Sequence, residues 1–330
     1  MKPTNSNSNL SRGYTAALIS ALLLSTTAIL IRILTQSYHL PALVLAFWRD
    51  VMVAATILLV LAVVNPLLLR VKRAEVAYLV VLYGFVLALF NALWTLSVAL
   101  NGAAISTVLV YSSAAFTALL GRWLLSESLD WVKILAIVLT FGGCFFVSGI
   151  LDQSQISANL VGILTGVASG LLYAVYSLMG RFASQRGLNP WTTLPYIFGF
   201  ASPFLLGMNL VSVGRIPGAP LQTAEILWKD GNLAGWAILF GLAAGPTLVG
   251  FATYLISLSY LPSSVANLLM TLEPVFTSIT AYFLLAERMT ASQIGGSLFI
   301  LAGVIFMRFM EGKLLRTAAS GDGEVLPAAD

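Results

Sequence analysis

The sequence predicts an all-α polytopic membrane protein with ten transmembrane helices, arranged as two inverted five-helix repeats with both termini in the cytoplasm. Composition is the first indication, because 59% of the residues are hydrophobic and only 9% are charged, far outside the range of soluble globular domains. The apolar runs are about 20 residues long, the length that a helix needs to cross a bilayer. A pattern of polar residues that occurs once in each half of the chain predicts the two repeats.

The predicted helices are continuous apolar runs separated by short polar gaps. Continuous rather than alternating hydrophobicity favours helices over strands, and a sheet edge facing lipid would leave backbone groups without hydrogen-bond partners. In chain order, the predicted helices cover residues 14–36, 41–63, 76–97, 102–125, 130–149, 160–182, 191–213, 233–258, 263–285 and 292–311.

The repeat is carried by polar residues and a proline at fixed spacing. Arg-x-x-x-Gln-x-x-x-x-Pro occurs at 32–41 and again at 181–190, and Leu-Leu-x-Glu occurs at 124–127 and 284–287. Each copy holds five apolar runs, an odd number, so the second copy must enter the membrane in the opposite orientation. Inverted repeats of this kind are typical of transporters that build two gates around one site.

The repeat divides the chain into five parts. We expect a short polar N-terminal tail at 1–13, a first five-helix repeat at 14–150, a linker at 151–159, a second repeat at 160–311 and a disordered C-terminal tail at 312–330. The second repeat is longer than the first in segment 214–231. This segment is either a partial cover of the outer mouth or a passive connector.

The distribution of Lys and Arg predicts the orientation. With the N-terminus inside, twelve of these residues lie in inner segments and four in outer ones, while Arg49 lies within a predicted helix. The positive-inside rule therefore places both termini in the cytoplasm of a multi-pass protein of the cytoplasmic membrane. The same rule accounts for the net charge of +4, so nucleic acid is not an expected partner.

Several enzyme classes and cofactors are not expected. The only cysteine, Cys144, lies inside an apolar run, which gives no disulfide framework and no thiolate metal site. The only histidine, His39, lies in a short loop, so neither a histidine metal cluster nor a Ser-His-Asp triad can form. No phosphate-binding glycine loop with its lysine occurs, so ATP-driven pumping by this chain is not expected.

The second predicted helix carries two charges, Arg49 and Asp50. Charges inside a membrane helix are costly and often functional. Consecutive residues point about 100° apart on a helix, so we do not expect these two to pair with each other. Arg49 either binds an anionic group or counters an acid elsewhere, with a structural ion pair or a contact to backbone carbonyls as the alternative. For Asp50 the structural alternative is favoured.

The ninth predicted helix carries Glu273 directly before Pro274. A proline inside a helix frees a backbone carbonyl, and a carboxyl group beside that defect is a candidate for proton uptake. Glu273 is therefore a proton- or substrate-coupled switch, or else a protonated side chain hydrogen-bonded to a neighbouring helix. The sequence leaves open whether Arg49 and Glu273 meet.

Polar and aromatic residues recur near the middle of the helices. Such side chains at membrane depth need a hydrogen-bond partner or a wet cavity, although packing explains any single one. As a group they predict a cavity for neutral or amphipathic metabolites, including aromatic ones. The candidates for the lining are Arg49, Asn91, Trp94, Tyr111, Tyr173, Tyr176, Tyr254 and Asn267.

Two glycine patterns concern packing and bending. Gly162, Gly166 and Gly170 form a flat stripe on the sixth predicted helix, which predicts close helix packing. Gly245 and Pro246 predict a kink in the eighth helix, with a hinge as the functional interpretation. The candidates for coupling or gating are Asp50, Glu273, Pro274, Gly245 and Pro246.

Several of these segments resemble a known family. Thr-Leu-Glu-Pro-Val-Phe-Thr at 271–277, Leu-Leu-Ala-Glu-Arg at 284–288 and Phe-Trp-Arg at 47–49 are similar to the EamA-type proteins of the drug/metabolite transporter superfamily. The resemblance implies ten helices in two inverted repeats, and export or exchange of small metabolites. The first repeat has Ala114 where the second has Pro274, so a symmetric pair of proline-kinked helices is not expected.

The functional expectation is a secondary-active transporter, an exporter or exchanger of a small organic metabolite such as an amino acid or related compound, working by alternating access. Its partners would be that substrate, protons as a coupling ion, and the lipid bilayer, with no cofactor and no metal. Oligomerisation stays open. The alternatives are an intramembrane enzyme acting on a lipid-linked substrate, and a membrane channel or sensor without a transport cycle.

Overall fold

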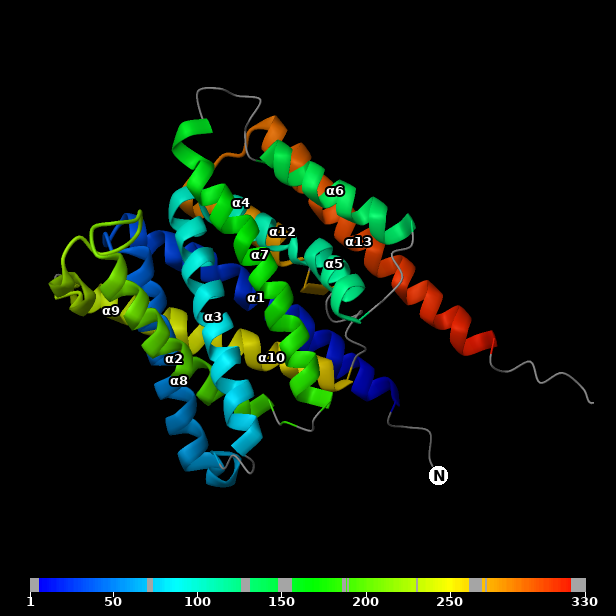
Figure 1. Cartoon of the computed structure of the whole chain (residues 1–330), viewed down its shortest axis with the longest axis horizontal. Coiled ribbons are helices and arrows are strands. Elements are labelled where there is room, and N and C mark those ends of the chain that lie inside the picture. The colour runs from blue at the N-terminus through cyan, green and yellow to red at the C-terminus, as the bar shows by residue number, and fades with distance from the viewer. Residues whose placement is uncertain are drawn as a thin grey trace, which may run out of the picture.

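The computed structural model describes residues 6–69, 74–125, 131–147, 156–185, 188, 190–229, 231–260, 269–270 and 272–321. All regular elements within these residues are helices (Figure 1). The first half holds α1 (Ser6–Gln36), α2 (Ala42–Val64), η1 (Pro66–Leu69), α3 (Ala74–Asn101), α4 (Ala103–Val110), α5 (Ser113–Leu125) and α6 (Trp131–Val147). The second half holds α7 (Ile156–Gln185), α8 (Pro190–Ser212), η2 (Thr223–Leu227), α9 (Leu233–Leu242), η3 (Ala243–Thr247), α10 (Leu248–Tyr260), α12 (Glu273–Leu285) and α13 (Ala291–Gly321).

Six of the described helical segments are long and apolar enough to cross a membrane. Three further apolar segments are shorter, at Ala103–Thr117, Ile134–Gly143 and Ala291–Phe306. The six long segments are Ser11–Gln36, Ala42–Val64, Val80–Asn101, Leu160–Met179, Trp191–Ser212 and Leu233–Tyr254.

Some boundaries differ from those predicted. The helix α1 begins at Ser6, within the expected N-terminal tail, and α13 continues to Gly321, so the first part of the expected disordered tail is helical. The fourth predicted helix is divided, because Tyr111 and Ser112 donate their backbone N–H groups three residues back, to Val108 and Leu109, instead of four. Such a tighter turn interrupts the regular α-helix.

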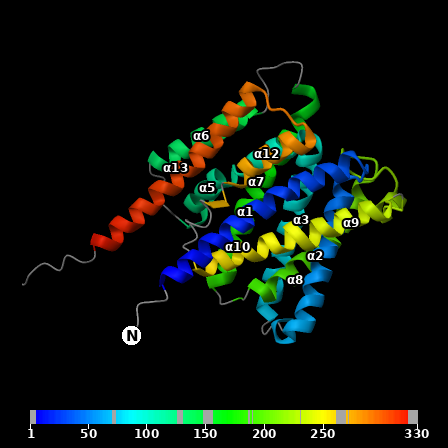
Figure 2. The same cartoon turned by 180° about the vertical axis from the view of Figure 1, so that it is seen from behind.

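The packing of the helices is symmetric under exchange of the two halves. The first helix of each half packs on the third helical unit of the other, as α1 on α10 and α7 on α3. The second helices pack on each other as α2 on α8, and the last helices as α6 on α13, which lie side by side along one flank (Figures 1 and 2).

The first helices of the two halves run in opposite directions. Arg32, near the end of α1, donates to the carbonyl of Val98 near the end of α3, at 3.4 Å. Ser97 on that same part of α3 donates to the carbonyl of Gly162, near the beginning of α7, at 2.9 Å. The end of α1 and the beginning of α7 therefore meet at one end of the molecule. Following the orientation predicted from Lys and Arg, we call this the outer end.

The glycine stripe packs as predicted. A Cβ atom on Gly162 would collide with Asn101, one on Gly166 would lie 2.7 Å from Leu109 Cδ1, and one on Gly170 would collide with Ser112. The stripe therefore lets α7 approach the end of α3 and the α4–α5 junction closely. The Gly245–Pro246 step also disturbs its helix, because η3 (Ala243–Thr247) is a π-helical turn between α9 and α10.

Candidate functional site

Arg49 and Asp50 on α2 are buried inside the protein, with 1% and 0% of their surfaces exposed. The expectation that they cannot pair with each other is wrong, because Arg49 Nε lies 3.4 Å from Asp50 Oδ1. Their Cβ atoms diverge as in any helix, but the long arginine side chain bends back to its neighbour. Burial favours this arrangement, since an unpaired charge in a low-dielectric interior is very costly.

Asn91 on α3 holds the carboxylate of Asp50 from the other side. Its Nδ2 lies 3.0 Å from Asp50 Oδ1 and 2.7 Å from Oδ2. The guanidinium of Arg49 lies over the ring of Trp94, also on α3, with Cζ 5.8 Å from the ring centroid. This is within the range of a cation–π contact. We call Arg49, Asp50, Asn91 and Trp94 the Arg49 cluster.

Two donors in the Arg49 cluster have no hydrogen-bond partner among the described residues. They are Arg49 Nη2 and Trp94 Nε1, and both atoms are buried. Buried polar groups are nearly always hydrogen-bonded, so these two require an explanation. The cluster as a whole is neutral, because one arginine faces one aspartate.

A continuous band of aromatic rings extends from the Arg49 cluster. Trp94 stacks near Phe90 at 6.3 Å, and Phe90 lies 5.4 Å from Tyr173, measured between ring centroids. Tyr173 lies 6.2 Å from Tyr176, which lies 4.5 Å from Tyr83. These five residues, which we call the aromatic band, join α3 to α7. The structure therefore places Trp94, Tyr173 and Tyr176 in one band, with Asn91 beside Trp94 in the Arg49 cluster. None of these four residues lines the cavity described below, so their role as a cavity lining stays a prediction.

Glu273 at the start of α12 contacts Tyr111 at the end of α4. The Tyr111 hydroxyl oxygen lies 3.1 Å from Glu273 Oε2 and 2.5 Å from the carbonyl oxygen of Met270. A hydroxyl group has one proton and cannot donate to both oxygens at once. A protonated Glu273 satisfies all three groups, because its carboxyl donates to Tyr111 and Tyr111 donates to Met270.

The remaining candidates are distributed around these groups. Tyr254 on α10 lies near Tyr83 and Tyr111, so it belongs to the same region. Pro274 is buried and occupies the first turn of α12 rather than its middle, so it begins a helix in the described residues instead of kinking one. Asn267 lies outside the described residues.

Arg49 and Glu273 use different partners. Among the described ion pairs, Arg49 pairs with Asp50, whereas Glu273 contacts Tyr111. The described part of the chain also contains no group of three or more His, Cys, Asp or Glu side chains that could hold a metal ion.

A second polar cluster lies at the end of the molecule that we call outer. Arg32 Nε lies 3.3 Å from Glu287 Oε1, and both side chains are 17% exposed. With its amide oxygen turned toward Arg32, Gln36 accepts from Nε at 3.0 Å and from Nη2 at 2.7 Å. Arg32 also donates through Nη1 to the carbonyl of Ala99. Since Arg32 lies near the end of α1 and Glu287 follows α12, this ion pair joins the two halves of the chain.

Glu287 also caps α4. Its oxygens accept from the backbone N–H of Ala103 at 3.0 Å and of Ala104 at 3.2 Å. These groups form the N-terminus of α4, where the helix dipole stabilises a negative charge. The close approach requires Gly102, whose φ is +87° and whose Cβ, if present, would lie 2.7 Å from the carboxylate. We call Arg32, Gln36, Gly102 and Glu287 the outer latch.

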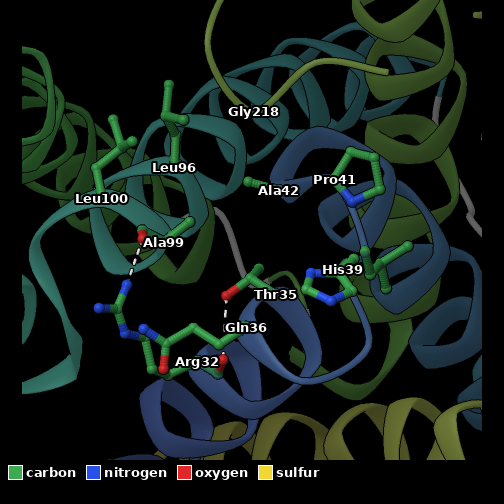
Figure 3. A pocket seen from close by; sticks show the side chains of 11 residues that line it. Arg32, Thr35, Gln36, His39, Pro41, Ala42, Leu96, Ala99, Leu100 and Gly218 are labelled. Carbon is green, nitrogen blue, oxygen red and sulfur yellow. Dashed lines mark hydrogen bonds between the residues drawn. The ribbon is translucent and has the colours of Figure 1, made fainter. Parts of the chain in front are cut away.

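A cavity of about 460 Å³ lies beside the outer latch (Figure 3). Arg32, Gln36 and Pro41 of the first repeat motif all line it, together with Gly218 of the loop between α8 and α9. That loop is packed against the helices, because Trp48 Nε1 donates to the carbonyl of Ile226 at 2.8 Å. The loop therefore contributes to the outer wall of the cavity.

Sequence reasoning missed two parts of this arrangement. Tyr83 was not a candidate, although it lies 8 and 11 residues before Asn91 and Trp94, a spacing that places all three near one face of a helix. Arg32 served as a landmark of the repeat and of the orientation, but it was not a candidate site residue. Its recurrence as Arg181 in the repeat motif was the signal that it has a structural role.

Comparison with known proteins gives one family and several relatives. The sequence model of the EamA-like transporter family matches residues 11–149 and 160–309. A protein of Archaeoglobus fulgidus, described as an uncharacterized transporter, is 26% identical over 223 residues, 66% of this chain and 73% of its own length. The threonine/homoserine exporter RhtA of Salmonella typhimurium is 25% identical over 241 residues, 72% of each chain.

One solved crystal structure shares the fold. It is 16% identical in sequence and superposes with a TM-score of 0.59, covering 92% of this chain and 99% of its own.

Proposed function

The chain belongs to the EamA-like transporter family, and we propose that it is a secondary transporter that exports or exchanges a small organic metabolite by alternating access. In this proposal ten helices form two inverted five-helix repeats in the cytoplasmic membrane, with both termini inside. The family match over both halves supports a membrane transporter with a small-molecule substrate. The exchange symmetry of the helix packing and the opposite directions of α1 and α7 support the inverted arrangement.

The outer latch is the observation that carries the alternating-access mechanism. The ion pair of Arg32 and Glu287 joins the two halves at the outer end at 3.3 Å, and both side chains are partly exposed. Contacts of this kind can break without unfolding either half, because they consist of one ion pair and a helix cap. The 460 Å³ cavity is already open on the side of Gln36 and His39, and opening the latch would connect it with deeper groups.

The Arg49 cluster, the aromatic band and Tyr111 would line the path of the substrate. Glu273 would take up and release the coupling proton, because its contact with Tyr111 and Met270 is complete only when its carboxyl is protonated. Gly245 and Pro246, in the π-helical turn between α9 and α10, would give the flexibility needed for gating.

An amino acid or related compound is the substrate class to test first. RhtA, whose name states that it exports threonine and homoserine, aligns with 72% of this chain. L-threonine and L-homoserine are therefore the first compounds of a wider metabolite panel.

Counterflow in proteoliposomes tests the proposal. Vesicles loaded with an unlabelled compound should accumulate the same labelled compound transiently, with saturable kinetics, for at least one member of the panel. Protein-free vesicles are the control. Flux that rises linearly with concentration and shows no counterflow would favour a channel, and no flux of any compound would contradict a transporter.

A further inference from the structure

The two buried donors without partners, Arg49 Nη2 and Trp94 Nε1, belong to one small cluster. Arg49 and Trp94 are 1% and 7% exposed, and Arg49 Cζ lies 5.8 Å from the centroid of the Trp94 ring. The guanidinium group and the indole ring that carry the two donors therefore lie next to each other. Neither can be satisfied by bulk water in this conformation, and neither has a partner among the described residues.

The missing partner must be an acceptor. An arginine N–H and an indole N–H are donors only, and a guanidinium group matches the paired oxygens of a carboxylate particularly well. The nearby carboxylate of Asp50 does not fill this role, since it faces Arg49 Nε and Asn91 Nδ2. A second carboxylate would be attracted by Arg49 and would also receive the indole N–H.

The net charge of the Arg49 cluster restricts the net charge that the ligand can carry. Arg49 and Asp50 cancel each other, so a simple anion would leave the buried site with a net negative charge, which is costly. A zwitterion adds no net charge. Its ammonium group can face Asp50 Oδ2, which accepts only from Asn91 among the described residues.

The geometry points to a binding site in the Arg49 cluster for the carboxylate of a zwitterionic amino acid, held by Arg49 Nη2 and Trp94 Nε1. This inference rests on the proposed function for the route by which the ligand reaches the buried cluster. A buried water molecule would satisfy the same two donors, and the experiment separates the two occupants.

The experiment measures thermal stabilisation of the purified protein by the proteinogenic amino acids, each beside its α-amide, which lacks the carboxylate but keeps the side chain. We expect at least one amino acid, and not its amide, to stabilise the protein, because a ligand stabilises the state that it binds. Trp94→Phe removes the indole donor together with part of the ring, and should weaken that amino acid's binding at least about 10-fold, the effect of one hydrogen bond to a charged group. Trp236→Phe on α9, whose ring packs on Trp48 and Trp228, is the matched control and should leave the affinity unchanged.

Three results would overturn the inference: stabilisation by no amino acid, equal stabilisation by acid and amide, or equal affinity in Trp94→Phe. Unliganded Trp94→Phe should melt below the unchanged protein, because the smaller ring leaves a cavity at a buried position. Binding is therefore measured as each protein's ligand-induced shift from its own unliganded melting temperature. Carboxylate-selective binding without counterflow would refute the transporter but keep the site. Counterflow of compounds without a carboxylate, with no selective binding, would keep the transporter and refute the site.

Discussion

Replacing Glu287 by Gln should open the outer end of the protein. The carboxylate accepts from two backbone N–H groups at the start of α4 and pairs with Arg32 Nε at 3.3 Å. Glutamine keeps one acceptor oxygen but loses the charge. A hydrogen bond to a charged group contributes about 1.5–3 kcal/mol, and partial exposure places the outer latch toward the lower end of that range. A loss of about 2 kcal/mol would shift the equilibrium between closed and open outer ends by roughly 30-fold, since 1.4 kcal/mol corresponds to a factor of ten.

Labelling of a cysteine placed in the outer cavity measures this opening. Leu96 lines the cavity and is 4% exposed, so Leu96→Cys in a Cys144→Ser background reacts with a membrane-impermeant maleimide mainly when the outer end opens. Adding Glu287→Gln should raise the labelling rate by up to about 30-fold, following the shift in the equilibrium. In unfolded protein, Leu96→Cys should react at the same rate with and without Glu287→Gln, because every cysteine is then accessible.

Glu225 is the matched control for this experiment. It accepts from the backbone N–H of Leu221 at 2.8 Å and is partly exposed, but it belongs to the loop between α8 and α9 rather than to the outer latch. Glu225→Gln should leave the labelling of Leu96→Cys unchanged. Equal labelling rates in Glu287→Gln and Glu225→Gln would refute the assignment of the latch.

Three further predictions concern coupling and packing. Glu273→Gln should remove the pH dependence of counterflow, because glutamine imitates the protonated carboxyl permanently; a pH profile that keeps its shape would refute the coupling role. Gly170→Ala should lower the free energy of unfolding by about 1–3 kcal/mol through overpacking. Gly142→Ala is the control and should not lower it, because nothing lies within 4 Å of the new Cβ. Equal melting temperatures of the two variants would contradict the close packing at Gly170. Asp50→Asn should destabilise the protein by about 3–5 kcal/mol, measured by chemical denaturation, because it leaves Arg49 without its counter-charge. Adding Arg49→Gln in the same chain should restore much of the lost free energy of unfolding. If the second substitution restores none of it, the broken ion pair is not the cause of the loss.

The helices and their close contacts could be predicted because they depend on local sequence. Apolar runs gave most helix boundaries within a few residues, the stripe from Gly162 to Gly170 predicted where α7 packs tightly, and the Gly245–Pro246 step coincides with the π-helical turn η3. In each case the cause lies in the residues of the helix itself, which the sequence shows directly.

The polar contacts were harder to predict because they depend on side-chain reach and on distant segments. Angular separation on a helix wheel excluded the Arg49–Asp50 pair, but it describes Cβ directions and not the reach of an arginine side chain. The Arg32–Glu287 pair joins residues 255 positions apart, and only the repeated motif indicated that Arg32 has a structural role. The break between α4 and α5 contains neither proline nor glycine, so no local signal marked it.

The central claim is that the two ends of one pathway open in turn, and paired distance measurements test it most directly. Spin labels at the exposed positions Ser37 and Arg288 report on the outer end, and labels at Phe182 and Trp131, on α7 and α6, report on the opposite end. In Glu287→Gln the distance between the labels at Ser37 and Arg288 should increase, while the distance between the labels at Phe182 and Trp131 should decrease. If both distances increase together, or neither changes, the two ends do not alternate and the proposed mechanism is wrong.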